Sequence, residues 1–177
     1  MHAKRGHLFE VKRRLGGAFS INGFIVAFSD SLVLLHRLEM DTFRLNGYTV
    51  LRSRDISDYR VFDTAENWQF RAVNHFHLKP IRPTGISVAS LPELLASTSR
   101  HYPLLTFHPE RKDPDICYIG PLLSMTQRTF TIEDLDSNGE WSGPRRMKFS
   151  DVTMVDFGDG YAGALAATAP DRPKPPE

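Results

Sequence analysis

The stretch from Gly23 to Ser57 constrains the fold most, because it alternates short apolar segments with turns. With the residues that follow it, this stretch predicts four short strands, at Phe24–Phe28, Leu32–Leu35, Thr49–Arg52 and Tyr59–Phe62. The second of these is apolar at every position, as expected of a strand buried on both faces. A polar loop is predicted at residues 39–46. Four short strands joined by turns are typical of a small β-barrel.

Residues 23–35 resemble the first signature of the Sm-like (Hfq/LSm-type) family, which runs from a glycine through alternating apolar residues to an aspartate and an apolar strand. Gly23 and Asp30 match the glycine and the aspartate, with Ser29 as one additional residue. Residues 50–61 lie where the second signature of the family lies. The resemblance implies a small barrel, assembly into rings and binding of single-stranded RNA.

The second signature also departs from the family. Ile56-Ser57 matches its apolar-then-small step, but the preceding pair here is Arg54-Asp55. The bacterial members carry Lys-His at that place, and the eukaryotic members carry Arg-Gly. Because an aspartate in a phosphate-facing loop repels RNA, the resemblance supports the fold more than it supports RNA binding.

Residues 102–161 repeat the plan of the first half. Their predicted strands are Leu104–Phe107, Cys117–Leu123, Arg128–Leu135, Met147–Phe149 and Asp151–Val155. Gly47 and Gly143 lie 96 positions apart, and so do Asp55 and Asp151. In each half the glycine precedes a basic strand and the aspartate opens the last strand. We infer a diverged internal duplication. The alternative is a chance similarity between hairpins that begin with glycine.

A short helix is predicted between the two halves. Ser90 can accept the N-terminal capping hydrogen bond, Pro92 suits the first turn, and Glu93 completes a capping box. Its apolar stripe consists of Leu91, Leu94 and Leu95. A terminal helix is expected at residues 161–168, which are rich in alanine.

A further strand is predicted where Trp68, Phe70 and Ala72 alternate with polar residues. His75 and His77 would then share one face, at a spacing acceptable for a metal pair. No third ligand follows at a motif spacing, so ordinary surface histidines are the stronger interpretation, and no metal site is predicted.

The composition is that of a globular protein. It gives the chain no overall positive electrostatic field that would attract nucleic acid. The formal net charge of the 177 residues is +1, so binding to nucleic acid would need a local basic patch. The one cysteine, Cys117, cannot form an internal disulfide, which fits a reducing compartment. The longest apolar runs are far shorter than the roughly 20 residues of a membrane span. We expect a cytoplasmic protein without contact to a membrane.

The basic residues of the first sixteen positions allow two interpretations. They form either a solvated first strand or short helix, or an arm that contacts phosphate. The first is favoured, because short basic clusters are common and the net charge is small.

No motif of an enzyme is recognisable. The sequence lacks a glycine-rich phosphate loop, a serine elbow and a HExxH zinc motif. Cys117 lies between apolar and aromatic residues and is expected to be a buried thiol rather than a nucleophile. Residues 134–139 imitate the start of a calcium loop, but Arg145 stands where the loop needs a glutamate, so Asn138-Gly139 is better interpreted as a hairpin turn. We expect neither catalysis nor a cofactor.

The fold class expected is mainly β, with two tandem SH3-like or Sm-like barrels. Their bounds are residues 1–85 and 102–168, with a linking helix within residues 86–101 and a disordered tail at residues 169–177.

The function expected is non-catalytic binding, through protein interaction, scaffolding or self-association. Binding of single-stranded RNA is the alternative, with bases on aromatic rings and phosphates on arginine and lysine. The candidate binding residues are Tyr48, Arg52, Arg54, Tyr59, Trp68, Trp141, Arg145, Arg146 and Lys148.

Overall fold

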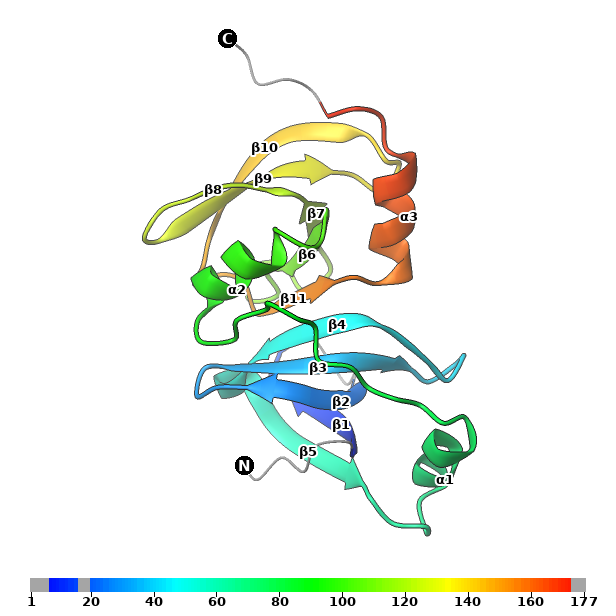
Figure 1. Ribbon diagram of the computed structural model, residues 1–177. Coiled ribbons are helices and arrows are strands. Elements are labelled where there is room, and N and C mark those ends of the chain that lie inside the picture. The colour runs from blue at the N-terminus through cyan, green and yellow to red at the C-terminus, as the bar shows by residue number, and fades with distance from the viewer. Residues whose placement is uncertain (1–6, 16–19, 173–177) are drawn as a thin grey trace.

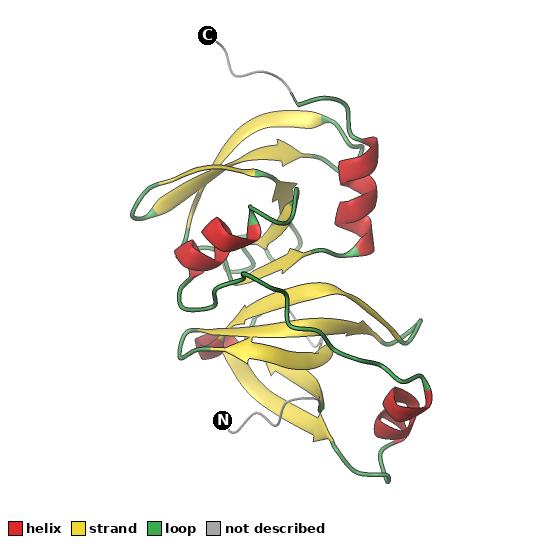
Figure 2. Cartoon of the chain, in the orientation of Figure 1, coloured by secondary structure: helices red, strands yellow, loops and turns green. Residues whose placement is uncertain are grey.

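The described residues are mainly β and form one open antiparallel sheet with three α-helices (Figures 1 and 2). A computed structural model describes residues 7–15 and 20–172. The first half contains β1 (Leu8–Arg13), β2 (Ser20–Phe28), β3 (Leu32–Glu39), β4 (Arg44–Arg52) and β5 (Ile56–Phe62), with a 3-10 turn at Ser53–Asp55. The second half contains β6 (Leu105–His108), β7 (Tyr118–Gly120), β8 (Leu122–Met125), β9 (Thr129–Leu135), β10 (Trp141–Lys148) and β11 (Met154–Phe157).

The two halves share one strand order. In the first half the strands follow β5-β1-β2-β3-β4, and in the second they follow β11-β6-β7-β9-β10, with β8 beside β9. Gly47 of β4 and Gly143 of β10 therefore occupy corresponding strands, and both have positive φ, +66° and +91°. In the described part of the chain no strand pairing closes either half into a ring of strands. The sequence-predicted barrels are thus observed as two halves of one open sheet.

The halves join where the last strand, β11, lies between β4 and β6 (Figure 1). Val155 of β11 faces Val50 of β4 on one side and Phe107 of β6 on the other. Gly47 is required at this junction, because a Cβ there would lie 2.5 Å from the backbone nitrogen of Asp159. The junction is therefore built from backbone pairing and close packing together.

β3 is buried on both faces, as the sequence predicts for residues 32–35. Leu32 and Leu34 belong to a core that α2 (Leu91–Thr98) and strands of the second half complete. Val33 and Leu35 belong to a separate core inside the first half. This two-sided burial explains why the segment carries no polar side chain.

Two of the three helices agree with the sequence. Ser90 caps α2, because its side chain accepts a hydrogen bond from the Glu93 nitrogen at 3.3 Å. Asp159 caps α3 (Gly160–Thr168) in the same way, from the nitrogen of Ala162 at 2.8 Å. Among the described residues no helix is long and apolar enough to cross a membrane.

The predicted strand at Trp68 is wrong, because residues 68–75 form helix α1 (Trp68–His75). Gln69, Arg71 and Ala72 all favour a helix. An alternation over five residues is too short to distinguish the two-residue period of a strand from the 3.6-residue period of a helix. His75 ends this helix and His77 follows with a φ of +51°, so the two histidines do not share a strand face.

Other strand limits also differ from the prediction. The expected loop at residues 39–46 shrinks to a turn, since β3 reaches Glu39 and β4 begins at Arg44. Pro121 interrupts the predicted strand at 117–123, because it lacks the donor that continues a ladder. Asp151 lies in a turn three residues before β11. Residues 169–172 form neither helix nor strand, and the remainder of the predicted tail, with the N-terminal six residues, lies outside the described residues.

Candidate functional site

Three of the predicted binding residues gather at one place in the second half. Arg145, Arg146 and Lys148 lie on β10 and line two adjoining pockets, of about 910 and 610 Å³. The pockets share Thr129, Arg146 and Lys148 as lining residues, so they form one continuous surface. We call this surface the β10 groove.

The larger pocket of the β10 groove is positively charged. It lies beside the turn that joins β8 to β9, and its lining contains three cations and no carboxylate. The cations are Arg128, Arg146 and Lys148, all exposed. Within the described residues none of them forms an ion pair, and the only side-chain hydrogen bond is from Arg146 Nε to Thr129 Oγ1 at 3.1 Å. This half of the groove is suited to phosphate or another polyanion.

The smaller pocket contains an arginine held in a fixed orientation. The Nε of Arg145 donates to the buried carboxylate of Asp134 at 2.7 Å. Its guanidinium lies over the ring of Tyr118, 4.0 Å from the centroid. The side chain remains 40 % exposed, and its two terminal nitrogens bond to no described residue. Arg145 is therefore fixed and still has donors free for a ligand.

The position of β10 at the end of the sheet makes both pockets reachable by one ligand. Arg145 and Arg146 leave the strand on opposite faces, because successive side chains alternate. Among the described strands β10 pairs only with β9, so its other edge is open in this part of the chain. A flexible chain lying along this edge contacts side chains on both faces of the strand.

Arg52 and Arg54 do not belong to the groove lining. Arg52 donates to the backbone oxygen of Val152 at 2.6 Å and to that of Phe149, so it fastens the first half to the second. Partial burial lowers the pKa of Arg52, with Arg54 and Arg111 adding to the effect. Arg54 is 60 % exposed and lies 3.9 Å from Asp55, which also binds Arg111.

Tyr48 and Trp141 serve the interior rather than a binding surface. The Tyr48 ring lies between His36, at 4.6 Å, and Phe157, at 5.3 Å between centroids. Burial, followed by the charge of Tyr102, raises the pKa of Tyr48. Trp141 packs under α3, and its Nε1 donates to the oxygen of Pro170 at 2.9 Å. Neither ring is free to stack on a base.

Tyr59 and Trp68 are exposed but lie apart from the groove, in the first half. Tyr59 is on the edge strand β5 and 45 % exposed. Trp68 begins α1, which has no buried residue, and it contacts Phe43 at 5.9 Å between centroids. Phe43 also contacts Phe76, at 5.7 Å. These three rings form an exposed aromatic cluster, which we call the α1 cluster.

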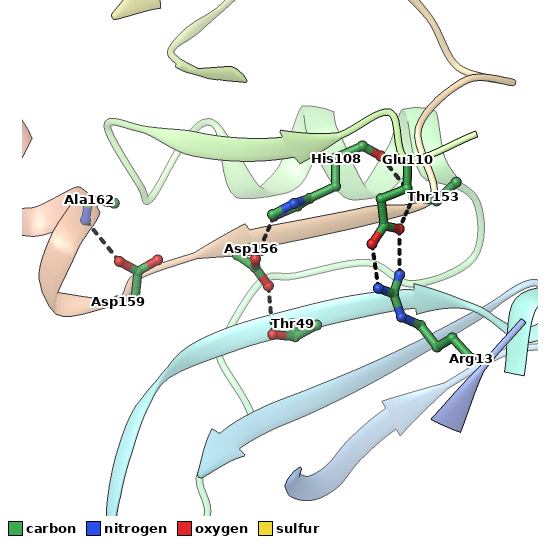
Figure 3. Close-up of polar contacts among 8 residues, drawn as sticks. All are labelled: Arg13, Thr49, His108, Glu110, Thr153, Asp156, Asp159 and Ala162. Carbon is green, nitrogen blue, oxygen red and sulfur yellow. Dashed lines mark hydrogen bonds and ion pairs between the residues drawn. The ribbon is translucent and has the colours of Figure 1, made fainter. Parts of the chain in front are cut away.

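The junction between the halves contains a buried polar network that could be mistaken for a catalytic triad (Figure 3). Asp156 accepts from Thr49 Oγ1 at 2.6 Å and from His108 Nε2 at 2.8 Å. A triad needs the histidine between the hydroxyl and the acid, so that it can take the hydroxyl proton. Here the acid is in the middle, and Thr49 stays protonated. The network therefore holds the halves together.

A cavity of about 520 Å³ lies beside this network. Its lining mixes charges of both signs, from Arg13 and Arg37 to Glu110, Asp115 and Asp156. A mixed lining selects for neither anions nor cations. No group of three or more histidine, cysteine, aspartate or glutamate residues in the described ranges is arranged to hold a metal ion.

The sequence prediction for Cys117 is wrong in one respect, since this residue is exposed. It precedes the short strand β7. The ring that contacts Arg145 belongs to its neighbour, Tyr118. Desolvation of the thiol, with Asp156 and Asp134 adding negative charge, raises the pKa of Cys117. A raised pKa disfavours the reactive thiolate.

Sequence reasoning missed Tyr118 and Arg128 as groove residues. One signal could have found Arg128, because it directly precedes Thr129, the β9 residue that pairs with Lys148, and its backbone oxygen accepts from the nitrogen of Phe149. Tyr118 gives no such signal, because β7 touches β9 at a single residue pair.

Comparison of the chain with protein-family models, with curated proteins and with solved structures gave no match.

Proposed function

We propose that the protein is a non-catalytic binding module of two tandem Sm-like barrels, and that its β10 groove binds single-stranded RNA. The shared strand order of the halves supports the tandem arrangement. The observation that carries the binding is the lining of the larger pocket, where three exposed cations face a surface without carboxylates. We place this module in the cytoplasm, in keeping with its single cysteine.

An uneven distribution of charge over the surface makes RNA binding compatible with a net charge of +1. Five other cations of the described residues are paired with acids, as Arg13 is with Glu110, Lys112 with Asp151 and Arg145 with Asp134. Arg128, Arg146 and Lys148 are not, within the described residues, so the local field at the groove is positive. Single strands fit better than duplexes, because only a flexible chain follows the edge of β10.

The test is binding of a fluorescent undecamer of uridine, measured by anisotropy between 50 and 200 mM salt. Three phosphate contacts predict an affinity that falls about twenty-fold over this range. Replacing Arg128, Arg146 and Lys148 together with glutamine should abolish most of the salt dependence. Lys79→Gln, which removes an exposed cation of the first half, is the matched control and should bind as the natural chain does. Absence of binding at 50 mM salt would refute the proposal.

A protein contact is the second candidate function, and the α1 cluster favours it. Trp68, at the start of α1, and Phe76, the residue that caps its C-terminal end, are 52 % and 57 % exposed, and α1 itself has no buried residue. Exposed aromatic rings anchor interfaces, and uncharged ones suit an apolar partner surface such as a second copy of the chain. Sedimentation velocity over a range of concentrations tests this. A dimer that Trp68→Ser dissociates would support it, and a monomer at all concentrations would leave the groove as the binding surface.

A further inference from the structure

We propose that the smaller pocket of the β10 groove recognises one guanine base of the bound strand. This inference rests on the proposed RNA binding and adds base selectivity to it. The terminal nitrogens of Arg145 would donate to O6 and N7 of guanine, and the carboxylate of Asp113 would accept from its N1–H and N2–H₂ groups.

Arg145 has the geometry that such recognition needs. Asp134 holds its Nε and Tyr118 holds its plane, so both terminal nitrogens are presented in one fixed direction. A bidentate contact loses less entropy when the arginine is already immobile. Guanine is the base that presents two acceptors side by side, which match the two donors of a guanidinium end.

The acids of the smaller pocket distinguish a base from a phosphate. Asp113 and Asp151 both line it, whereas the larger pocket has no acid. Asp151 is paired with Lys112 at 2.6 Å, whereas the half-buried Asp113 forms no side-chain hydrogen bond or ion pair within the described residues. A free carboxylate repels phosphate and accepts hydrogen bonds from amino and imino groups. The groove thus divides into a phosphate side and a base side.

The shared lining residues place the two sides within reach of one nucleotide strand. Arg146 and Lys148 border both pockets, so phosphates bound to them lie next to a base in the smaller pocket. Thr129 lines both pockets, and its hydroxyl accepts a hydrogen bond from Arg146 Nε. One guanine bound at this point would set the position of the strand along β10.

The experiment compares undecamers that differ in the central base only, between flanks of five uridines. With guanine at the centre, affinity should exceed that of the all-uridine strand by roughly ten-fold to a hundred-fold. With 7-deazaguanine, which lacks the N7 acceptor, most of the preference should disappear. With hypoxanthine, which lacks the N2 amino group, part of it should disappear, because the contact to Asp113 is weakened. These comparisons need no altered protein.

Variants then assign the preference to Arg145. Arg145→Lys keeps the charge and loses the planar fork, so it should weaken binding of the guanine strand by a larger factor than binding of the uridine strand, and the guanine preference should be lost. Tyr118→Leu should reduce the preference, and Tyr118→Phe, which keeps the ring, should retain it. Lys148→Gln should weaken binding of both strands equally, leaving their ratio unchanged.

Three results would contradict the inference, and they can be told apart. Equal affinity for the guanine and uridine strands refutes base recognition and leaves RNA binding in place. No binding of either strand refutes both. A guanine preference that Arg145→Lys retains also contradicts the assignment.

Discussion

Arg13 and Glu110 form a two-pronged ion pair between the two halves of the protein. Nη1 of Arg13 donates to Oε2 of Glu110 at 2.6 Å, and Nη2 donates to Oε1 at 2.5 Å (Figure 3). Each side chain is only 7 % exposed. The single hydroxyl proton of Thr153 is shared between two acceptors, the carboxylate of Glu110 and the backbone oxygen of His108, the latter at 2.8 Å. The pair therefore belongs to a buried network that spans the junction.

Removing one partner of this pair should be strongly destabilising. Arg13→Ala leaves the Glu110 carboxylate buried without its cation, and we expect a loss of about 3–5 kcal/mol in the free energy of unfolding. Arg13→Met combined with Glu110→Leu should lose less of the free energy of unfolding, because no charge is left buried without a partner. Arg37→Ala, an exposed arginine near the same cavity, should change stability by less than about 0.5 kcal/mol. Urea denaturation measures all three, and an unchanged midpoint for Arg13→Ala would contradict the prediction.

The same network predicts sensitivity to acid. Burial alone would raise the pKa of Asp156, but hydrogen bonds from His108 and Thr49 and the charge of His108 hold it below its usual value. The pKa of Glu110 is likewise lowered, since Arg13 and Thr153 outweigh its burial. Carboxyl groups with a lowered folded-state pKa stabilise the protein above their unfolded values, about 3.9 and 4.3, and lose that contribution as pH falls further.

The free energy of unfolding should therefore be level between about pH 7 and 5 and fall below that range. Thr49→Val removes one hydrogen bond to Asp156, so the fall should become smaller. Equilibrium unfolding at several pH values checks both statements. A natural chain whose stability does not change between about pH 5 and 3 would count against them.

Gly47 should tolerate no side chain. Its φ of +66° and the approach of the Asp159 nitrogen, 2.5 Å from an added Cβ, oppose any substitution. We expect Gly47→Ala to destabilise by about 2–5 kcal/mol. Gly163→Ala is the matched control, since its Cβ meets nothing within 4 Å and helix α3 should gain up to about 1 kcal/mol. Thermal unfolding compares the two, and similar midpoints for both variants would refute the argument.

Pro144 should keep the open edge of β10 from pairing with another strand. Glu133, its partner on β9, donates its N–H to Pro121 at 3.1 Å, away from β10. Pro144 therefore faces the open edge, where it removes a donor. Pro144→Val should increase self-association in sedimentation velocity, whereas Pro114→Val, in an exposed loop, should not. If both variants behave as the natural chain does, the proline has no such role.

Much of the strand pattern was readable because local chemistry decided it. The two-sided burial of β3 follows from its unbroken apolar run, and the cap of Ser90 follows from a short-range hydrogen bond. α1 was misassigned because its apolar residues fit both periods, and no local signal shows that the segment lacks a neighbouring strand.

The site was only partly readable, for a different reason. Arg145, Arg146 and Lys148 lie within four positions of one another, so their proximity in space could be predicted without knowing the fold. The role of Arg52 depends on the oxygens of Phe149 and Val152, about a hundred positions away. Tyr118 meets Arg145 only because β7 and β10 flank β9. Contacts between distant segments depend on tertiary packing, which cannot be read from short local sequence patterns.

The place of β11 between β4 and β6 has a consequence for how the chain is made. Both neighbours of β11 leave the ribosome before it does, since synthesis runs from the N-terminus. Until residue 157 has emerged, Val50 and Phe107 belong to two strands with an unsatisfied edge. A nascent or truncated chain that stops short of β11 thus exposes two unpaired strand edges, each of which can pair with a strand of another chain. The synthesis of β11 therefore decides whether the two halves form a finished sheet or a substrate for chaperones and proteases.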